Sequence, residues 1–142
     1  MTTVWLVAIL SLTLPSEYQP RSTRTGSFPL PGPPGTKTNE EFRSWVAPGG
    51  KELYLFYWTP AARDLGPMAV VSEFPARVAG QDTKIIETSM FMGRKQRVLV
   101  AHLGFKEKGS AMIYAIGLDR REFESILAGV ARVEKDGSAR PR

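Results

Sequence analysis

The sequence predicts an α+β fold, in which an antiparallel β-sheet forms a meander and a C-terminal amphipathic helix packs on one face of it. Two patterns lead to this prediction. Runs rich in Val, Ile, Tyr and Phe alternate with glycine-bearing turns over residues 42–118, and an apolar stripe of helical period follows over residues 120–133. The length of 142 residues and the hydrophobic content of 42% suit one domain with tails.

The first apolar segment, residues 4–14, reads VWLVAILSLTL and carries no charge. As a helix it would reach only about 17 Å, short of the roughly 30 Å hydrocarbon core of a membrane. Its length is typical of the apolar region of a secretory signal. Residues 15–35 then hold six prolines and three glycines, the composition of a linker.

Residues 1–26 are therefore predicted to be a signal-like segment and a proline-rich linker outside the domain. The protein is then expected to be exported, periplasmic or extracellular, and to touch a membrane only through this segment if it is not cleaved. The other interpretation makes residues 4–14 a buried strand or helix of the fold.

The domain itself is predicted to span residues 27–134, followed by a disordered basic tail over residues 135–142. Most of the net charge of +5 lies in the two ends, since residues 27–134 hold 14 basic and 12 acidic side chains. This small excess argues against specific nucleic-acid binding, which needs a dense basic surface.

Residues 42–47 and 51–59 are predicted to form a β-hairpin, because Gly49 and Gly50 supply the positive φ angles of a tight turn. Side chains alternate between the two faces of a strand. Both faces of the second arm are apolar, so we expect cover on both sides of the sheet. One face carries Tyr54, Phe56 and Trp58, and the other carries Leu53, Leu55 and Tyr57.

The later runs of β-forming residues are predicted to complete the meander. A turn at residues 80–82 and a second around Gly93 separate some of them. The predicted strands are residues 68–71, 76–79, 84–91, 96–105 and 111–118.

A helix is predicted over residues 120–133. Asp119 and Glu122 have the spacing of a capping box at its start. Gly129 interrupts a helix at a cost of about 1 kcal/mol, so we expect a strand to approach the backbone closely there. A second, short helix is expected at residues 39–42 or 61–65.

The second half of the chain also shows an ordered set of motifs. A V-A-G-Q turn occupies residues 78–81, AMIYAIGLD occupies residues 111–119, and D-x-x-E-F-x-x-I-L occupies residues 119–127. In this order, with strands between them, the motifs resemble the PsbP/Mog1-like fold family. The resemblance covers residues 79–133 and concerns topology, and the first half matches only loosely through residues 42–58.

The resemblance implies a binding or assembly role without a particular ligand. Members of this family are mostly non-enzymatic. They include accessory subunits of photosynthetic membrane complexes, small exported bacterial proteins and a nuclear transport factor.

Catalytic chemistry has few candidate residues, because the chain has no cysteine and one histidine. This excludes disulfides, thiolate catalysis and metal sites that need a thiolate or two histidines. An enzyme alternative, a small hydrolase, would use His102 as its base, with Ser89 or Ser110 and a carboxylate such as Glu87. No nucleophile motif marks such a site. The sequence therefore predicts no catalytic residue, cofactor or metal.

The favoured interpretation is a non-catalytic binding or accessory domain that acts through a surface on a protein or membrane-complex partner. Tyr54, Phe56 and Trp58 form one candidate surface, since aromatic side chains concentrate binding energy at interfaces.

The basic turn at Arg94, Lys95 and Arg97 forms the second candidate surface. It also carries a further alternative, weak contact with nucleic acid or with an anionic surface.

Overall fold

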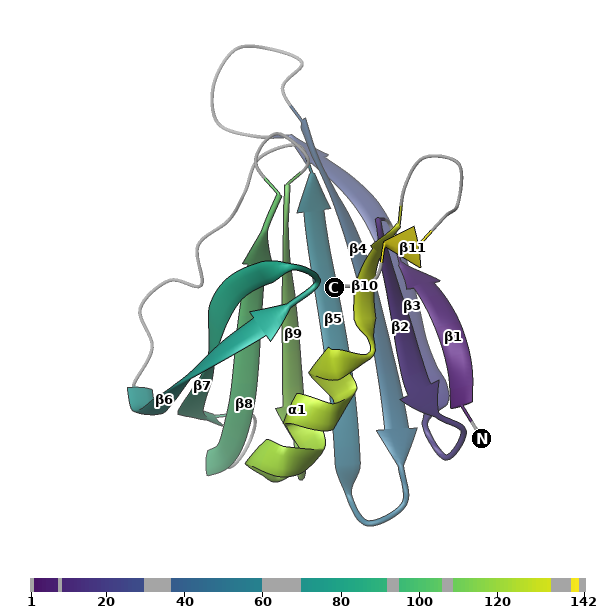
Figure 1. The fold of residues 1–142 in the computed structure, drawn as a ribbon. Coiled ribbons are helices and arrows are strands. Elements are labelled where there is room, and N and C mark those ends of the chain that lie inside the picture. The colour runs from purple at the N-terminus through teal and green to yellow at the C-terminus, as the bar shows by residue number, and fades with distance from the viewer. Residues whose placement is uncertain are drawn as a thin grey trace.

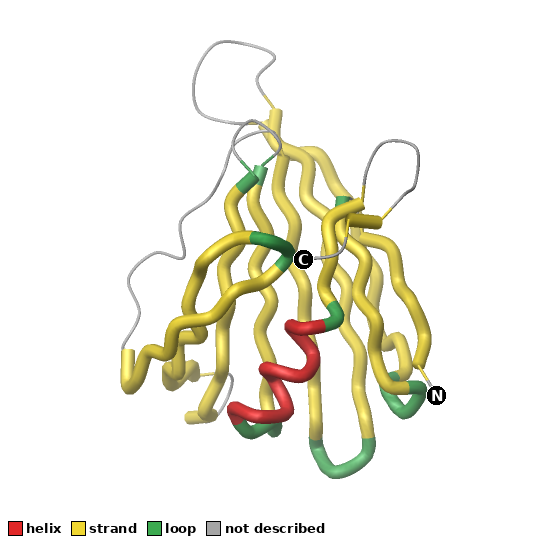
Figure 2. The backbone as a smooth tube through the Cα atoms, viewed as in Figure 1, coloured by secondary structure: helices red, strands yellow, loops and turns green. Residues whose placement is uncertain are grey.

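A computed structural model describes residues 2–7, 9–29, 37–59, 70–91, 95–105, 109–133 and 139–140. Two antiparallel sheets and one helix make up this part of the chain (Figures 1 and 2). In chain order the elements are β1 (Thr2–Val7), β2 (Leu10–Pro15), β3 (Gln19–Pro29), β4 (Lys37–Ala47), β5 (Lys51–Thr59), β6 (Val70–Val78), β7 (Gln81–Phe91), β8 (Lys95–Gly104), β9 (Ser110–Ile116), α1 (Arg120–Ala128), β10 (Val130–Val133) and β11 (Ala139–Arg140).

The large sheet has seven strands in the order β3-β4-β5-β9-β8-β7-β6, and the small sheet has four in the order β1-β2-β10-β11. Figure 1 shows the large sheet as a curved layer behind α1 and the small sheet, with β6 and β7 curling toward the helix. The predicted antiparallel sheet with one helix near the C-terminus is confirmed in this coarse form. The described chain is β-dominated, with less helix than an α+β fold implies.

Residues 2–15 lie inside this fold. β1 and β2 form a hairpin, and β2 pairs with β10 so that Leu12 lies opposite Val130. Leu10, Leu12 and Leu14 are fully buried in the main core. The start of the domain, placed at residue 27 by the sequence, is therefore corrected. Alternate leucines of β2 bury one face of a strand, a period that the uniform hydrophobicity of residues 4–14 conceals.

The proline-rich segment also contributes a strand. β3 runs antiparallel to β4, with a break in register after Pro20. Prolines fit here because β3 is an edge strand, where one row of amide hydrogens has no partner in the sheet. At the other end β11, within the predicted tail, pairs with β10. The structure thus replaces part of the linker and part of the tail with edge strands.

β6 is a single strand where the sequence predicts two separate runs. Pro75 lies in its middle and breaks the apolar pattern, but β6 pairs only with β7 at the edge of the large sheet. Residues 39–42, one of the two predicted short helices, belong to β4, and residues 61–65, the other, lie outside the described chain.

The predicted capping box of α1 is confirmed. The Asp119 side chain accepts from the Glu122 amide at 2.8 Å, and the Glu122 carboxylate accepts from the Asp119 amide at 3.3 Å. The helix ends at Gly129 rather than at Val133, because the chain turns there into β10. The expected close approach at Gly129 is also confirmed. A Cβ on Gly129 would lie 2.7 Å from the carbonyl oxygen of Thr13 in β2.

The main core fills the space between the large sheet and the layer made by α1, β2 and β10. We call the side of the large sheet that faces this core the inner face and the other side the outer face. The predicted alternation along β5 is confirmed, since Leu53, Leu55 and Tyr57 belong to the main core and Tyr54 to a separate cluster.

Candidate functional site

The outer face of the large sheet carries its own apolar cluster. All described elements outside the large sheet lie on the inner side (Figure 1). Three half-buried side chains pack against the cluster and form its exposed edge: Phe42, Phe56 and Met112. The buried members are Tyr54, Val98, Val100, Tyr114 and Ile116.

Five rings on this face form what we call the aromatic row: Phe42, Tyr54, Phe56, Trp58 and Tyr114. The register places Phe42 opposite Phe56 and Tyr54 opposite Tyr114. The ring centroids are 4.6 Å apart in each of these two pairs, and those of Phe56 and Trp58 are 5.6 Å apart. The structure therefore brings the predicted set of three aromatic residues together and adds two that sequence reasoning missed.

Four rings of the aromatic row stack on one another, and the Phe42 ring is tilted by 45° to that of Phe56. The interplanar angle is 8° for Tyr54 and Tyr114 and 2° for Phe56 and Trp58. Tyr54 is only 7% exposed and Trp58 only 9%, whereas Phe56 remains half-buried. The stacked rings thus cover part of one another, and the outer face offers the half-buried Phe42, Phe56 and Met112 side chains for contact.

A polar group closes one end of the aromatic row. Arg21 Nη2 donates to Glu52 Oε1 at 2.9 Å, and the Tyr54 hydroxyl accepts from Arg21 and donates to Glu52. Burial, followed by the hydrogen bond to Glu52, raises the pKa of Tyr54. Burial also raises the pKa of Tyr114 to about 12. Both tyrosines are therefore neutral at physiological pH, so neither serves as a base there.

His102 also lies on the outer face, in β8 opposite Met112 of β9. Ser110 lies two residues before Met112 in β9, on the same face, and is buried, whereas Glu87 pairs with Leu99 on the inner face. Because opposite faces of a sheet cannot share one catalytic group, the structure does not assemble His102 with Glu87. The Ser89 side chain lies outside the described part of the chain.

The predicted basic turn is described only in part. Arg94 and the Lys95 side chain lie outside the described residues. Arg97 is exposed, and its Nε lies 2.7 Å from Glu87 Oε2. An acidic neighbour thus offsets the charge of the one basic side chain of this turn that is described.

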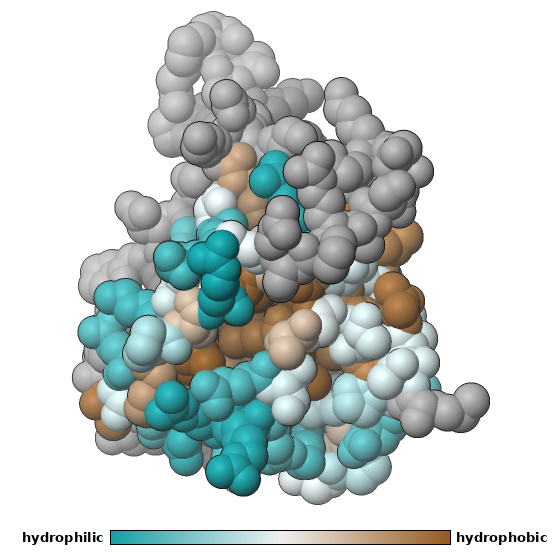
Figure 3. All heavy atoms as spheres, viewed as in Figure 1, coloured by the Kyte–Doolittle hydropathy of each residue, from teal (hydrophilic) through white to brown (hydrophobic). Residues whose placement is uncertain are grey.

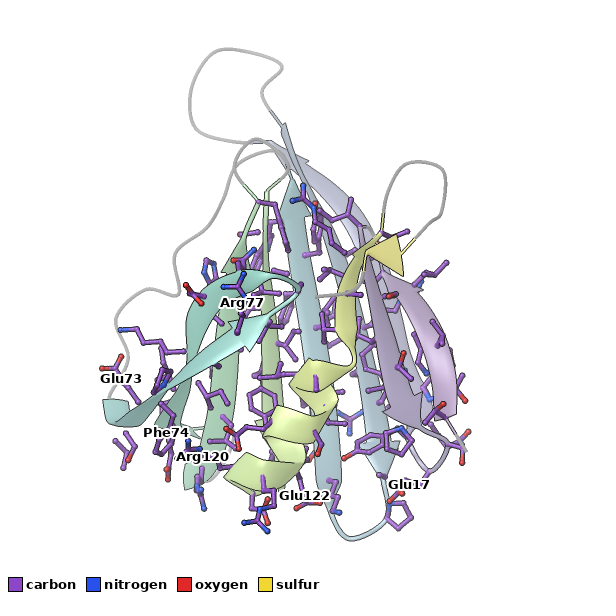
Figure 4. The ribbon with its side chains drawn as sticks, in the orientation of Figure 1. Glu17, Glu73, Phe74, Arg77, Arg120 and Glu122 are labelled. Atoms are coloured by element: carbon purple, nitrogen blue, oxygen red, sulfur yellow. The ribbon has the colours of Figure 1, made fainter. Side chains whose placement is uncertain are left out.

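A cleft of about 150 Å³ between α1 and the β6–β7 hairpin lies outside every predicted site. At its rim Arg77 pairs with Asp82 at 2.9 Å. Nearby, the Arg120 guanidinium lies 3.9 Å above the Phe74 ring and joins the helix to the hairpin (Figure 4). The cleft is lined by Ala76, Arg77, Val78, Ile85, Glu124, Leu127 and Ala128.

Among the described residues no helix is both long and apolar enough to cross a membrane. The same part of the chain holds no group of three acidic or histidine side chains arranged to bind a metal ion. Comparison with protein-family models, with curated proteins and with solved structures finds no match. The resemblance to the PsbP/Mog1-like family thus rests on the sequence motifs alone.

Proposed function

We propose that this protein is a non-catalytic binding domain that contacts a protein partner through the outer face of its large sheet. The observation that supports the proposal is the second apolar cluster, on the side of the sheet away from α1. A sheet with apolar clusters on both faces gains stability from cover on both. The described helix and small sheet cover the inner face.

The arrangement of this surface favours a protein over a sugar or a nucleobase. Sugars and bases stack on the open face of a ring, but four of the five rings of the aromatic row stack on one another. Half-buried Phe56 lies opposite half-buried Met112, with the Arg21–Glu52 pair at one end of the row. An apolar centre with a polar rim is typical of protein interfaces.

Site-specific photo-crosslinking tests the proposal whatever the identity of the partner. A photoreactive amino acid replaces Phe56 in the full chain, expressed in the cells that make the protein. The matched position is Ser125, which is exposed on α1, on the side of the large sheet away from the outer face. We expect a discrete adduct from position 56 and none of the same mass from position 125. Equal adducts from both positions, or none from position 56, would contradict the proposal.

A substitution beside the crosslinker identifies the surface. Met112→Glu places a carboxylate opposite residue 56, where it disfavours an apolar contact. We expect the adduct to disappear while the circular dichroism spectrum stays native. A persistent adduct in the folded variant would place the contact elsewhere.

The enzyme alternative centres on His102 and makes the opposite prediction. If the protein were a hydrolase, His102→Ala and His102→Gln would both abolish its cellular function. Under the binding proposal His102→Gln keeps function and the adduct from position 56, because a polar side chain remains opposite Met112 and the contact does not depend on a titrating base.

A further inference from the structure

We infer that two copies of this chain associate edge to edge through β1, so that the small sheets of the two copies continue into each other across a two-fold axis. β1 is the outermost strand of the small sheet, and its pairing among the described residues is with β2 alone. One side of the strand therefore presents backbone amide and carbonyl groups without a sheet partner in the described chain. Such a row is a template for another strand.

The other sheet edges carry features that discourage pairing. β3 contains Pro20 and Pro29, and β6 contains Pro75 between exposed Glu73 and Arg77. β11 has only two residues. Prolines, charges and very short edge strands block edge-to-edge association. β1 reads TTVWLV and has no proline, glycine or charge.

The side chains of β1 are also suited to association. Val4 is 60% exposed and Leu6 is 61% exposed, which places two large apolar side chains on one face of the strand. Trp5 points the other way, and its ring lies 6.0 Å from that of Trp45 in the core. Hydrophobic residues are visible at the side of the molecule where β1 lies (Figures 1 and 3).

A second copy of the chain is the occupant that these features favour. β1 carries no charge, so it offers no complement to a charged partner. A two-fold axis perpendicular to the sheet makes the two β1 strands antiparallel and keeps their apolar faces on the same side. In the register that places Val4 of one copy opposite Leu6 of the other, both apolar side chains gain a cross-strand neighbour. Among the described sheet edges β1 is the one without these features, so we expect association to stop at the dimer.

Charge substitutions on β1 test the inference. At concentrations up to the millimolar range, sedimentation should give the full chain a mass near twice 15.7 kDa. The double variants Val4→Lys/Leu6→Lys and Val4→Glu/Leu6→Glu each place like charges opposite one another. We expect their self-association to weaken by about tenfold or more. Mixing the two variants should restore a dimer, because each Lys then meets a Glu.

Val71→Lys is the matched control, since Val71 is 62% exposed but lies on β6, an edge that carries proline. It should leave the dimer intact. The inference is overturned if the wild-type chain is monomeric, if the β1 variants dimerise as well as the wild type, if Val71→Lys disrupts the dimer equally, or if mixing restores nothing. β1 lies apart from the outer face of the large sheet, so these outcomes are independent of the adduct from position 56.

Discussion

Gly129 has no side chain, which allows α1, β2 and β10 to meet closely at this residue. The Thr13 amide donates to its carbonyl at 2.9 Å, and an added Cβ would lie 2.7 Å from the Thr13 oxygen. Gly129→Ala should therefore destabilise the fold by about 1–3 kcal/mol in denaturant unfolding. Gly104→Ala is the control, because a Cβ there meets no atom within 4 Å. Equal stability of the two variants would mean that β2 does not approach α1 this closely.

Tyr114 gives the fold a defined sensitivity to alkali. Its pKa is raised from 10.0 to about 12 by burial, so the unfolded chain loses this proton first as the pH rises. The folded state is then destabilised progressively between about pH 10 and pH 12. In Tyr114→Phe the free energy of unfolding should fall less steeply across this window, as measured by urea titration at several pH values. Parallel curves for both proteins would show that the Tyr114 ring is not buried.

At the scale of elements, the contribution of β2 to stability shows whether the N-terminal apolar segment, residues 4–14, belongs to the fold. Leu12 is fully buried in the main core, so Leu12→Ala should cost about 2–5 kcal/mol of unfolding free energy. Val71→Ala, at a site 62% exposed, should change stability by less than about 0.5 kcal/mol. If Leu12→Ala is as mild as Val71→Ala, residues 10–15 are dispensable, as a leader outside the domain would be.

The sequence predicts those elements that are marked by residues within or next to them. The β4–β5 hairpin follows from Gly49 and Gly50, which have φ angles of 91° and 76°, and the start of α1 follows from its capping box. For residues 4–14 the sequence favoured a signal-like segment and left a buried strand or helix as the other interpretation, because the strand depends on pairing with β10, far along the chain. Likewise Tyr114 joins the aromatic row only because β9 pairs with β5. Alternation along β5 predicted Tyr54, Phe56 and Trp58, whereas burial of two of them depends on neighbouring strands.

For the whole molecule, the two faces of the large sheet carry two separate apolar clusters. The inner face and the β1–β2 hairpin build one core. If residues 4–14 were cleaved off as a signal segment, the chain would lose β1 and most of β2. We therefore expect the functional chain to keep these strands, wherever in the cell it acts. The outer face keeps Phe56 and Met112 half-buried at the edge of its own cluster. We expect a protein partner to cover this face.

Hydroxyl-radical footprinting of the purified chain and of the chain inside its own cells tests this claim most directly. Val71, which is 62% exposed, and Phe123, which is fully buried, serve as the exposed and buried internal controls. Phe56 and Met112 should be modified in the purified protein and protected in cells, while Val71 is modified and Phe123 is unmodified in both. Equal modification of Phe56 and Met112 in the two settings would contradict the claim.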